Sequence, residues 1–165
     1  MSEPDGFREY VVARQAGLLR TARLLTGDWQ QAEDLVQTAL VKVWPRWGRL
    51  IAKGENPDGY VRRVIVTSYL TWRRRRWWGE RPTTPMPDVS DAGDALAGVD
   101  LRDALARALR GLPPAQRAVL VLRFYEDLSV EQTAALLGCA AGTVKSQTAK
   151  ALEKLKDVVA MGEIR

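Results

Sequence analysis

The chain has 165 residues, of which 46% are hydrophobic and 27% are charged, so it can bury one or two small cores and is unlike a disordered protein. Its net charge of +5 is consistent with a polyanionic partner. A single cysteine, Cys139, and no histidine exclude an intramolecular disulfide and the usual Cys/His zinc sites. We also find no apolar run long enough to span a membrane and no signal-peptide core, which predicts a cytoplasmic protein without a membrane partner.

Helical periodicity dominates the chain, and no segment keeps the alternation of a half-buried strand, so we expect an all-α protein. Residues 6–81 contain three helical patterns. One runs from Asp28 to Trp44 and stops before Pro45, because proline cannot continue a helix. Its apolar stripe is Leu35, Val36, Ala39, Leu40 and Val43, and its polar side is Glu33, Asp34, Gln37, Thr38 and Lys42. Such a polar side is usually solvated surface. The loop expected over residues 47–59 is long for a compact helical domain and is therefore suspected of function.

The next helix is predicted over residues 60–78 and ends in four consecutive arginines, residues 73–76, framed by Trp72, Trp77 and Trp78. This combination suits single-stranded nucleic acid, because guanidinium groups follow phosphates while indole rings stack on unpaired bases. The alternative is that some tryptophans are core residues and the arginines form a solvated face. For Trp77 and Trp78 we weigh the two equally. A nucleic-acid role is favoured for the arginines, because so dense a positive cluster repels itself.

A change of composition divides the chain. Residues 81–98 contain three prolines and three aspartates among small polar residues, which is typical of a flexible linker. We therefore expect two small helical domains, residues 1–81 and 99–165, joined by a flexible acidic linker at residues 82–98. Four helical patterns follow in residues 99–160, and Pro113 and Pro114 mark the start of one of them.

Residues 112–156 have the pattern of a helix-turn-helix. Ser129 and Gln132 form a predicted capping box, and Gly138 follows Leu137 where a helix commonly ends at positive φ. A longer helix is expected to begin near Gly142. Its apolar side is Val144, Thr148, Ala151, Leu152, Leu155 and Val159, while Ser146, Ala149, Lys150 and Glu153 lie opposite, flanked by Lys145. Such a helix would read the major groove of DNA. The alternative is an ordinary pair of helices with a solvated face.

Three segments together resemble one family, the bacterial sigma factors of the extracytoplasmic-function class. Residues 32–44, AEDLVQTALVKVW, are similar to its region 2.2, and residues 57–76, PDGYVRRVIVTSYLTWRRRR, to regions 2.3 and 2.4. Residues 112–138 and the sequence GTVKS at residues 142–146 resemble region 4. The resemblance extends over residues 5–160, and the Tyr-Val-Arg-Arg and tryptophan–arginine stretches resemble the actinobacterial SigE-type branch.

This resemblance implies a protein that is not an enzyme, holds no cofactor or metal, and directs core RNA polymerase to promoter DNA. The β′ coiled coil of the polymerase would bind Asp34, Gln37, Thr38, Val41 and Lys42. The −10 element would be opened and read by Arg62, Arg63, Thr67, Trp72, Arg73, Arg74, Arg75 and Arg76. The −35 element would be read by Thr143, Lys145, Ser146, Gln147, Ala149 and Lys150.

Further partners follow from the same resemblance. The β flap of the polymerase would complete the contact with the core enzyme, the linker would thread towards the RNA exit channel, and an anti-sigma factor is a candidate regulator. Away from polymerase the chain would be a monomer, and in the holoenzyme it would be associated with the nucleoid.

Four positions depart from the family pattern. Thr67 replaces a frequent asparagine, Ala140 a frequent serine or proline, and Gln147 and Lys150 frequent arginines. Lysine at residue 150 keeps the charge but loses the bidentate fork, so the −35 sequence cannot be borrowed from a relative.

Two other function classes explain less of the chain. A stand-alone helix-turn-helix regulator would account for residues 112–160 and leave the polar helix at residues 28–44 and the arginine–tryptophan segment without a purpose. A nucleic-acid enzyme would need a carboxylate metal cluster, and the densest aspartates lie in the predicted linker, which is a poor place to preorganise a site.

Overall fold

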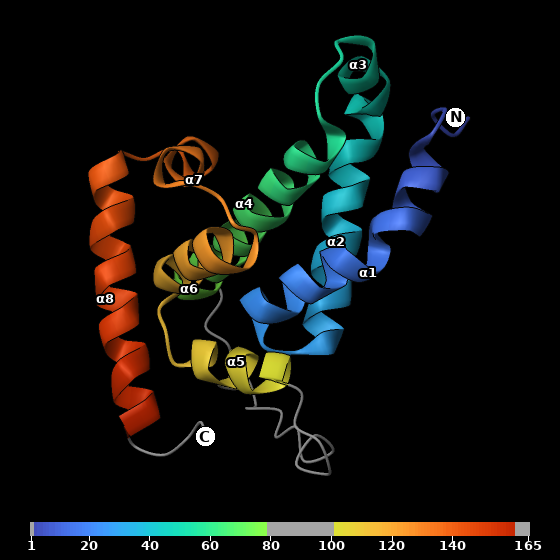
Figure 1. The fold of residues 1–165 in the computed structure, drawn as a ribbon. Coiled ribbons are helices and arrows are strands. Elements are labelled where there is room, and N and C mark those ends of the chain that lie inside the picture. Colours follow the sequence, from blue (N-terminus) through green and yellow to red (C-terminus); the bar gives the residue numbers. More distant parts are fainter. Residues whose placement is uncertain (1, 79–100, 161–165) are drawn as a thin grey trace.

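The computed structural model describes residues 2–78 and 101–160, with the side chains of residues 2–74 and 106–157. Every regular element in these ranges is helical, which confirms the predicted all-α fold (Figure 1). The first half contains α1 (Phe7–Thr26), α2 (Trp29–Val43), the 3-10 turn η1 (Trp44–Arg46), α3 (Trp47–Ala52) and α4 (Pro57–Trp78). The second half contains α5 (Leu101–Arg110), α6 (Pro114–Leu120), the π-helical turn η2 (Val121–Tyr125), α7 (Val130–Leu137) and α8 (Ala141–Ala160). None of the helices in the described ranges has the length and apolar character needed to cross a membrane.

In the first half, α2 packs against both α1 and α4. The predicted stripe of α2 faces this core: Leu35, Val36, Ala39 and Val43 are buried, and Leu40 is half-buried. The helix begins where the sequence indicated, because the Asp28 carboxylate accepts a hydrogen bond from the Gln31 N–H at 3.0 Å and caps the first turn.

The prediction of a loop over residues 47–59 is wrong for the first six of these residues, which form α3. Trp47 is 3% exposed, and its Nε1 donates to the carbonyl oxygen of Asp5 at 2.9 Å. Its ring also meets that of Phe7 edge-on at 5.3 Å. These contacts with the N-terminus stabilise a turn of helix that has little periodicity of its own. The following helix, α4, begins at Pro57 and not at Tyr60.

The helix-turn-helix forms as the sequence predicted. Both hydrogen bonds of the capping box between Ser129 and Gln132 are present, and Gly138 ends α7 at φ 70°. A small cluster of Val119, Ala134 and Val144 joins α6, α7 and α8. In α8, Val144 and Ala151 are buried and Thr148 and Leu155 half-buried, as expected. Leu152 is 45% exposed, so its assignment to the buried side is wrong, and the side chain of Val159 lies outside the described residues.

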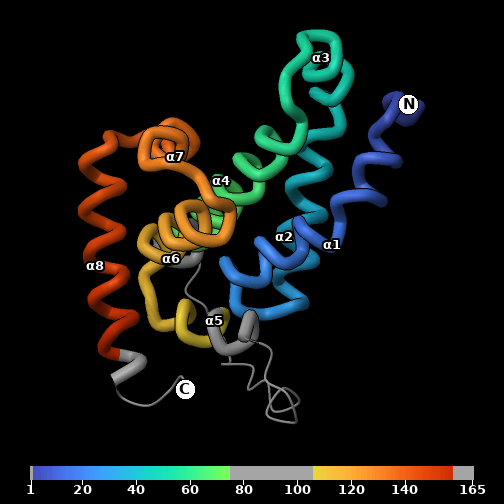
Figure 2. Tube along the Cα trace, in the orientation of Figure 1, coloured from blue at the N-terminus to red at the C-terminus, as the bar shows by residue number. Residues whose placement is uncertain are grey.

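The two halves pack against each other over α1 and α4 (Figure 2). Helix α1 contacts α5, α6 and η2, and α4 contacts α6 and α7. One continuous hydrophobic cluster includes Leu25 of α1 and Leu120 of α6. We call this packing of α5–α8 on α1 and α4 the closed arrangement. The predicted linker at residues 82–98 lies outside the described residues, and the predicted domain boundaries stay a prediction.

Arginines from the second half satisfy the carbonyl groups at the end of α1. Arg117, which is 3% exposed, donates from Nη1 to the Leu25 carbonyl at 2.6 Å. Arg110 donates from Nη2 to the Gly27 carbonyl at 2.6 Å. Gly27 has φ +79°, and a Cβ there would lie 2.8 Å from Cγ of Arg110, so both the turn and the contact require glycine. The last carbonyls of a helix carry partial negative charge, which these guanidinium groups complement.

Candidate nucleic-acid interface

The outer side of α2 displays the residues that the sequence singled out for protein binding. Asp34 and Gln37 are exposed, Thr38 is half-buried, and Val41 is 71% exposed. Their spacing puts these four on one side of the helix. An exposed valine between polar residues is suited to a protein contact, in which an apolar centre is bordered by polar groups. Lys42 differs, because its ammonium donates to the Ser68 hydroxyl at 3.0 Å and so ties α2 to α4.

The arginine-rich helix α4 is only partly open to solvent. Arg63, Thr67 and Arg74 are exposed and, with Thr71, form one stripe along the helix. The hydroxyl of Thr67 donates back to the Arg63 carbonyl at 2.8 Å. We call residues 63, 67, 71 and 74 the α4 stripe.

The other residues predicted on this helix lie elsewhere. Trp72 is half-buried and packs against the main core, which gives it a packing role in this arrangement, and Arg73 is half-buried. The side chains of Arg75, Arg76, Trp77 and Trp78 lie outside the described residues.

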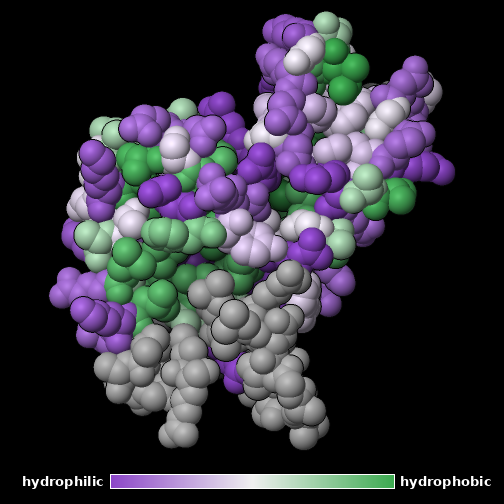
Figure 3. Space-filling model, viewed as in Figure 1, coloured by the Kyte–Doolittle hydropathy of each residue, from purple (hydrophilic) through white to green (hydrophobic). Residues whose placement is uncertain are grey.

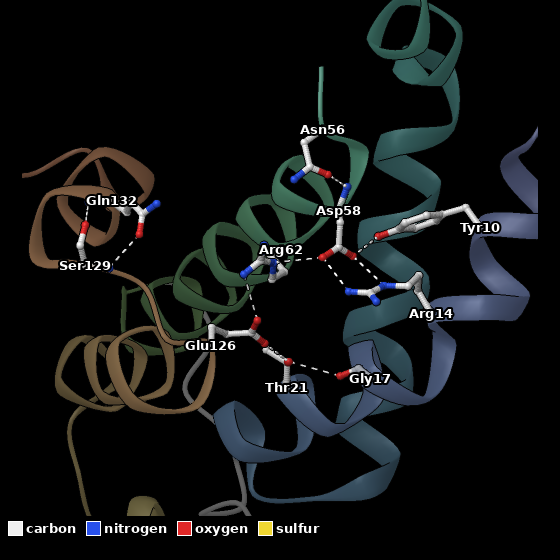
Figure 4. Close-up of polar contacts among 10 residues, drawn as sticks. All are labelled: Tyr10, Arg14, Gly17, Thr21, Asn56, Asp58, Arg62, Glu126, Ser129 and Gln132. Atoms are coloured by element: carbon white, nitrogen blue, oxygen red, sulfur yellow. Dashed lines mark hydrogen bonds and ion pairs between the residues drawn. The ribbon is translucent and has the colours of Figure 1, made fainter. Parts of the chain in front are cut away.

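Asp58, in the first turn of α4, holds that helix against α1 (Figure 4). Its carboxylate accepts hydrogen bonds from the Tyr10 hydroxyl at 2.8 Å and from Nη2 of Arg14 at 2.8 Å. Burial alone would raise the pKa of Asp58, but the hydrogen bonds from Arg14 and Tyr10 and the charges of Arg14 and Arg62 outweigh it, so the pKa lies below its ordinary value. Burial, and then the hydrogen bond to Asp58, raise the pKa of Tyr10. The carboxylate therefore stays charged and keeps α4 in register with α1.

Arg62 lies between two carboxylates in Figure 4. Its Nε is 3.5 Å from Asp58, one turn away on the same helix, and its Nη1 donates to Glu126 at 3.0 Å. Glu126 follows η2 in the second half and also accepts from the Thr21 hydroxyl of α1. These residues border a polar cavity of about 320 Å³ between α1, α4 and the end of η2. Arg62, predicted to bind −10 DNA, is thus engaged by protein carboxylates in the closed arrangement.

Sequence reasoning missed both of these carboxylates. Asp58 had a local signal, because a proline at the first helical position followed by an acidic residue is typical of a helix N-terminus. Glu126 had none, since its partners Arg62 and Thr21 lie 64 and 105 residues away along the chain.

The outward side of α8 is basic and open. Lys145, Ser146, Ala149, Lys150 and Glu153 are exposed, as the helical period predicted, and Thr143 is exposed as well. Gln147 is half-buried, and its Oε1 is a buried atom without a hydrogen-bond partner among the described residues. Lys154 and Lys156 are also exposed and extend the positive charge towards the C-terminal end. A helix with this surface after a tight turn can enter a major groove and contact phosphates.

An apolar cavity of about 200 Å³ lies where α1, α5, α6, η2 and α8 meet. It is lined by Leu24, Leu109, Leu120, Val121, Phe124, Tyr125, Leu152 and Leu155. Phe124 is 59% exposed and Leu152 is 45% exposed at its edge. Hydrophobic side chains gather in this part of the face drawn in Figure 3.

Comparison with known proteins gives one family for both halves. Residues 11–79 match Sigma-70 region 2, and residues 102–155 match Sigma-70, region 4. The RNA polymerase sigma-E factor of Streptomyces avermitilis is 45% identical over 151 residues, which cover 92% of this chain and 83% of that protein. The ECF RNA polymerase sigma factor SigM of Mycobacterium tuberculosis is 34% identical over 138 residues, covering 84% of this chain and 69% of that protein.

A solved structure has the same fold. The sigma factor RpoE of Bartonella quintana, in complex with the anti-sigma factor NepR, aligns with a TM-score of 0.70 at 24% identity, covering 95% of this chain and 98% of that chain. Two family regions in their order, a basic α8 face and relatives along nearly the whole length therefore point the same way. The chain belongs to the sigma-70 family, as an extracytoplasmic-function RNA polymerase sigma factor of the SigE-type branch, whose role is promoter-specific transcription initiation.

Proposed function

We propose that this chain divides promoter recognition between its two halves and attaches to core RNA polymerase through α2. The outer side of α2, with Asp34, Gln37 and Val41, binds the β′ coiled coil. The α4 stripe and the arginines that follow it contact the −10 element, and the basic side of α8 reads the −35 element as duplex. The observation that carries this proposal is the exposure of all three surfaces on helices held by buried cores.

A stand-alone helix-turn-helix regulator is not favoured. Such a protein would need only α6–α8, whereas the match to Sigma-70 region 2 covers residues 11–79. Reconstitution with core RNA polymerase separates the two functions. A sigma factor gives promoter-specific run-off transcripts only together with core enzyme, whereas a regulator binds promoter duplex tightly by itself. Tight, specific duplex binding without core would overturn the proposal.

Lys150 provides a test of −35 contact. Replacing Lys150 with alanine should reduce the salt dependence of promoter binding by about one unit of log–log slope if its ammonium touches a phosphate. The exposed Lys53, beyond α3, is the matched control, because Lys53→Ala removes the same charge far from α8. Holoenzyme binding to promoter DNA, measured over a salt series, gives both slopes. Equal slopes for wild type and Lys150→Ala would show that Lys150 points away from the duplex.

We further propose that an anti-sigma factor is a partner and that it covers the apolar cavity. The solved neighbour RpoE is bound to the anti-sigma factor NepR, and a second neighbour, CnrH, is bound to the cytosolic domain of CnrY. In this chain the exposed rings and methyl groups of Phe124 and Leu152 offer apolar surface of the sort that marks a protein contact. Leu152→Asp should therefore weaken a purified complex with its anti-sigma factor by at least about tenfold. Unchanged affinity in isothermal titration would place that partner elsewhere.

A further inference from the structure

The two helices proposed to contact DNA pack against one common helix. Both α4 and α8 contact α6, and packed helices have axes about 8–10 Å apart, so α4 and α8 approach within roughly 20 Å of each other. The names of the −10 and −35 elements place them about 25 base pairs apart, which is roughly 85 Å of duplex at about 34–36 Å per helical turn of 10–10.5 base pairs. The closed arrangement therefore cannot engage both elements at once, and the halves must separate before the promoter is bound.

We propose that the closed arrangement is an inhibited state of the free chain, held by a carboxylate latch in which Glu126 occupies Arg62 in place of a DNA phosphate. This inference rests on the proposed function for the role of α4 and α8 in DNA binding, and it adds Arg62, next to the α4 stripe, as a further contact of the −10 element. The latch consists of Glu126, Arg62 and Thr21, and it joins the end of η2 to both α4 and α1.

The latch is well sheltered from solvent. Nη1 of Arg62 donates to Oε2 of Glu126 at 3.0 Å, and the two side chains are only 19% and 14% exposed. The other carboxylate oxygen accepts the hydroxyl hydrogen of Thr21, a residue that is 2% exposed. Salt screens such a partly buried pair less than a surface pair. Physiological salt therefore weakens this contact less than it weakens an exposed ion pair.

A phosphate and a carboxylate compete for the same guanidinium. Both present oxygen acceptors that match the forked donors of arginine. The two partners of Arg62 differ in one respect. Asp58 lies one turn away on the same helix and stays beside Arg62 whether the halves are together or apart. Glu126 comes from the second half and leaves when the halves separate. Opening thus removes one acidic partner from Arg62 and lets a phosphate take its place.

The distance between the halves tests the latch without DNA or polymerase. Spin labels can be attached in a full-length background carrying Cys139→Ser, Lys53→Cys and Lys154→Cys, since both lysines are exposed and lie in different halves. Pulsed electron–electron double resonance should give one short distance between the two labels in this background. In Glu126→Gln, which keeps the shape and removes the charge, a second and longer population should appear. Thr21→Val, which retains every charge, should shift the populations in the same direction.

Asp127 provides the matched control. It is the adjacent carboxylate, is exposed, and has φ 59°, a conformation that asparagine tolerates. Asp127→Asn therefore makes the same change of net charge without touching Arg62, and its distance distribution should match that of the background.

A second measurement tests the competition itself. Fluorescence anisotropy with a mixed-sequence single-stranded oligonucleotide should show about 3–10-fold tighter binding by Glu126→Gln than by wild type. Asp127→Asn should stay within about twofold of wild type. Adding Arg62→Ala to Glu126→Gln should abolish the gain, because the freed guanidinium is then missing.

Three results would overturn the latch: an unchanged distance distribution in both Glu126→Gln and Thr21→Val, an equal gain in DNA binding by Asp127→Asn, or a gain that survives Arg62→Ala. A different result would contradict the proposed function itself. In that case the wild-type chain with core enzyme gives no promoter-specific transcript, whatever the distances between the labels.

Discussion

Replacing Asp34 with arginine should weaken binding to core RNA polymerase by about 30-fold or more while the fold stays intact. The carboxylate lies on the exposed side of α2, so a longer, positive side chain meets no buried neighbour. At the centre of an interface, reversing a charge both removes a favourable contact and adds a repulsive one, and such positions cost about 2 kcal/mol or more when altered. Gln37 and Val41, on the same side, would still touch the partner. The loss should therefore be large and not complete.

Competition for core enzyme with a fluorescently labelled wild-type chain measures this effect directly. Glu9→Arg is the matched control, because Glu9 is an exposed acid on α1, and its reversal changes the net charge by the same amount. A thermal melting curve for each variant confirms that the helices remain. If Asp34→Arg and Glu9→Arg compete equally well, the β′ contact does not include this side of α2.

Arg117→Ala should lower the free energy of unfolding by about 2–5 kcal/mol, the largest stability effect we expect from one polar side chain. Arg117 is buried, and it donates to the carbonyl of Leu25 at 2.6 Å and to that of Arg110 at 2.6 Å. Alanine removes the donor from a buried bond to Leu25 and from a partly buried bond to Arg110, and an unsatisfied buried group costs about 1–3 kcal/mol. Burial lowers the pKa of Arg117, but an arginine stays protonated in proteins, so the full charge is present at the end of α1.

The melting temperature should fall by roughly 5–15 °C in this variant, as expected for a chain of this size. Arg107→Ala is the control, because Arg107 lies on the exposed side of α5 in the same segment. The melting temperature of Arg117→Lys should lie between those of Arg117→Ala and Arg107→Ala. Lysine keeps the charge but loses the forked guanidinium that reaches two carbonyls. Circular dichroism melting curves give the melting temperature of each variant. A melting temperature equal to that of Arg107→Ala would mean that the Arg117 contacts add nothing to stability.

Local chemistry explains where sequence reasoning succeeded. The cap at Asp28, the capping box of Ser129 and Gln132 and the positive φ of Gly138 each depend on residues at most a few positions apart. The same holds for the sides of α2 and α8, because a period of 3.6 residues fixes which side chains share a face. These caps and helix sides are each determined by a short stretch of the chain. Together they are enough to predict an all-α protein with a helix-turn-helix near its end.

Tertiary contacts decided the rest. Helix α3 exists because Trp47 packs beside Phe7 and bonds to Asp5, about forty residues earlier, and periodicity cannot report such a contact. Periodicity predicts Leu152 on the buried side of α8, whereas in the structure its side chain is partly exposed at the rim of the apolar cavity.

Arg62 shows most clearly the difference between what the sequence determines and what tertiary packing determines. Its charge and its place in an arginine-rich helix are properties of the sequence, and they predict a phosphate partner. In the closed arrangement it instead meets two carboxylates, Asp58 on its own helix and Glu126, which lies 64 residues away. Periodicity and capping chemistry act over a few residues and therefore determined the helices and their exposed sides. Which of those sides remains open to DNA depends on how the two halves pack, and only the tertiary structure decides that.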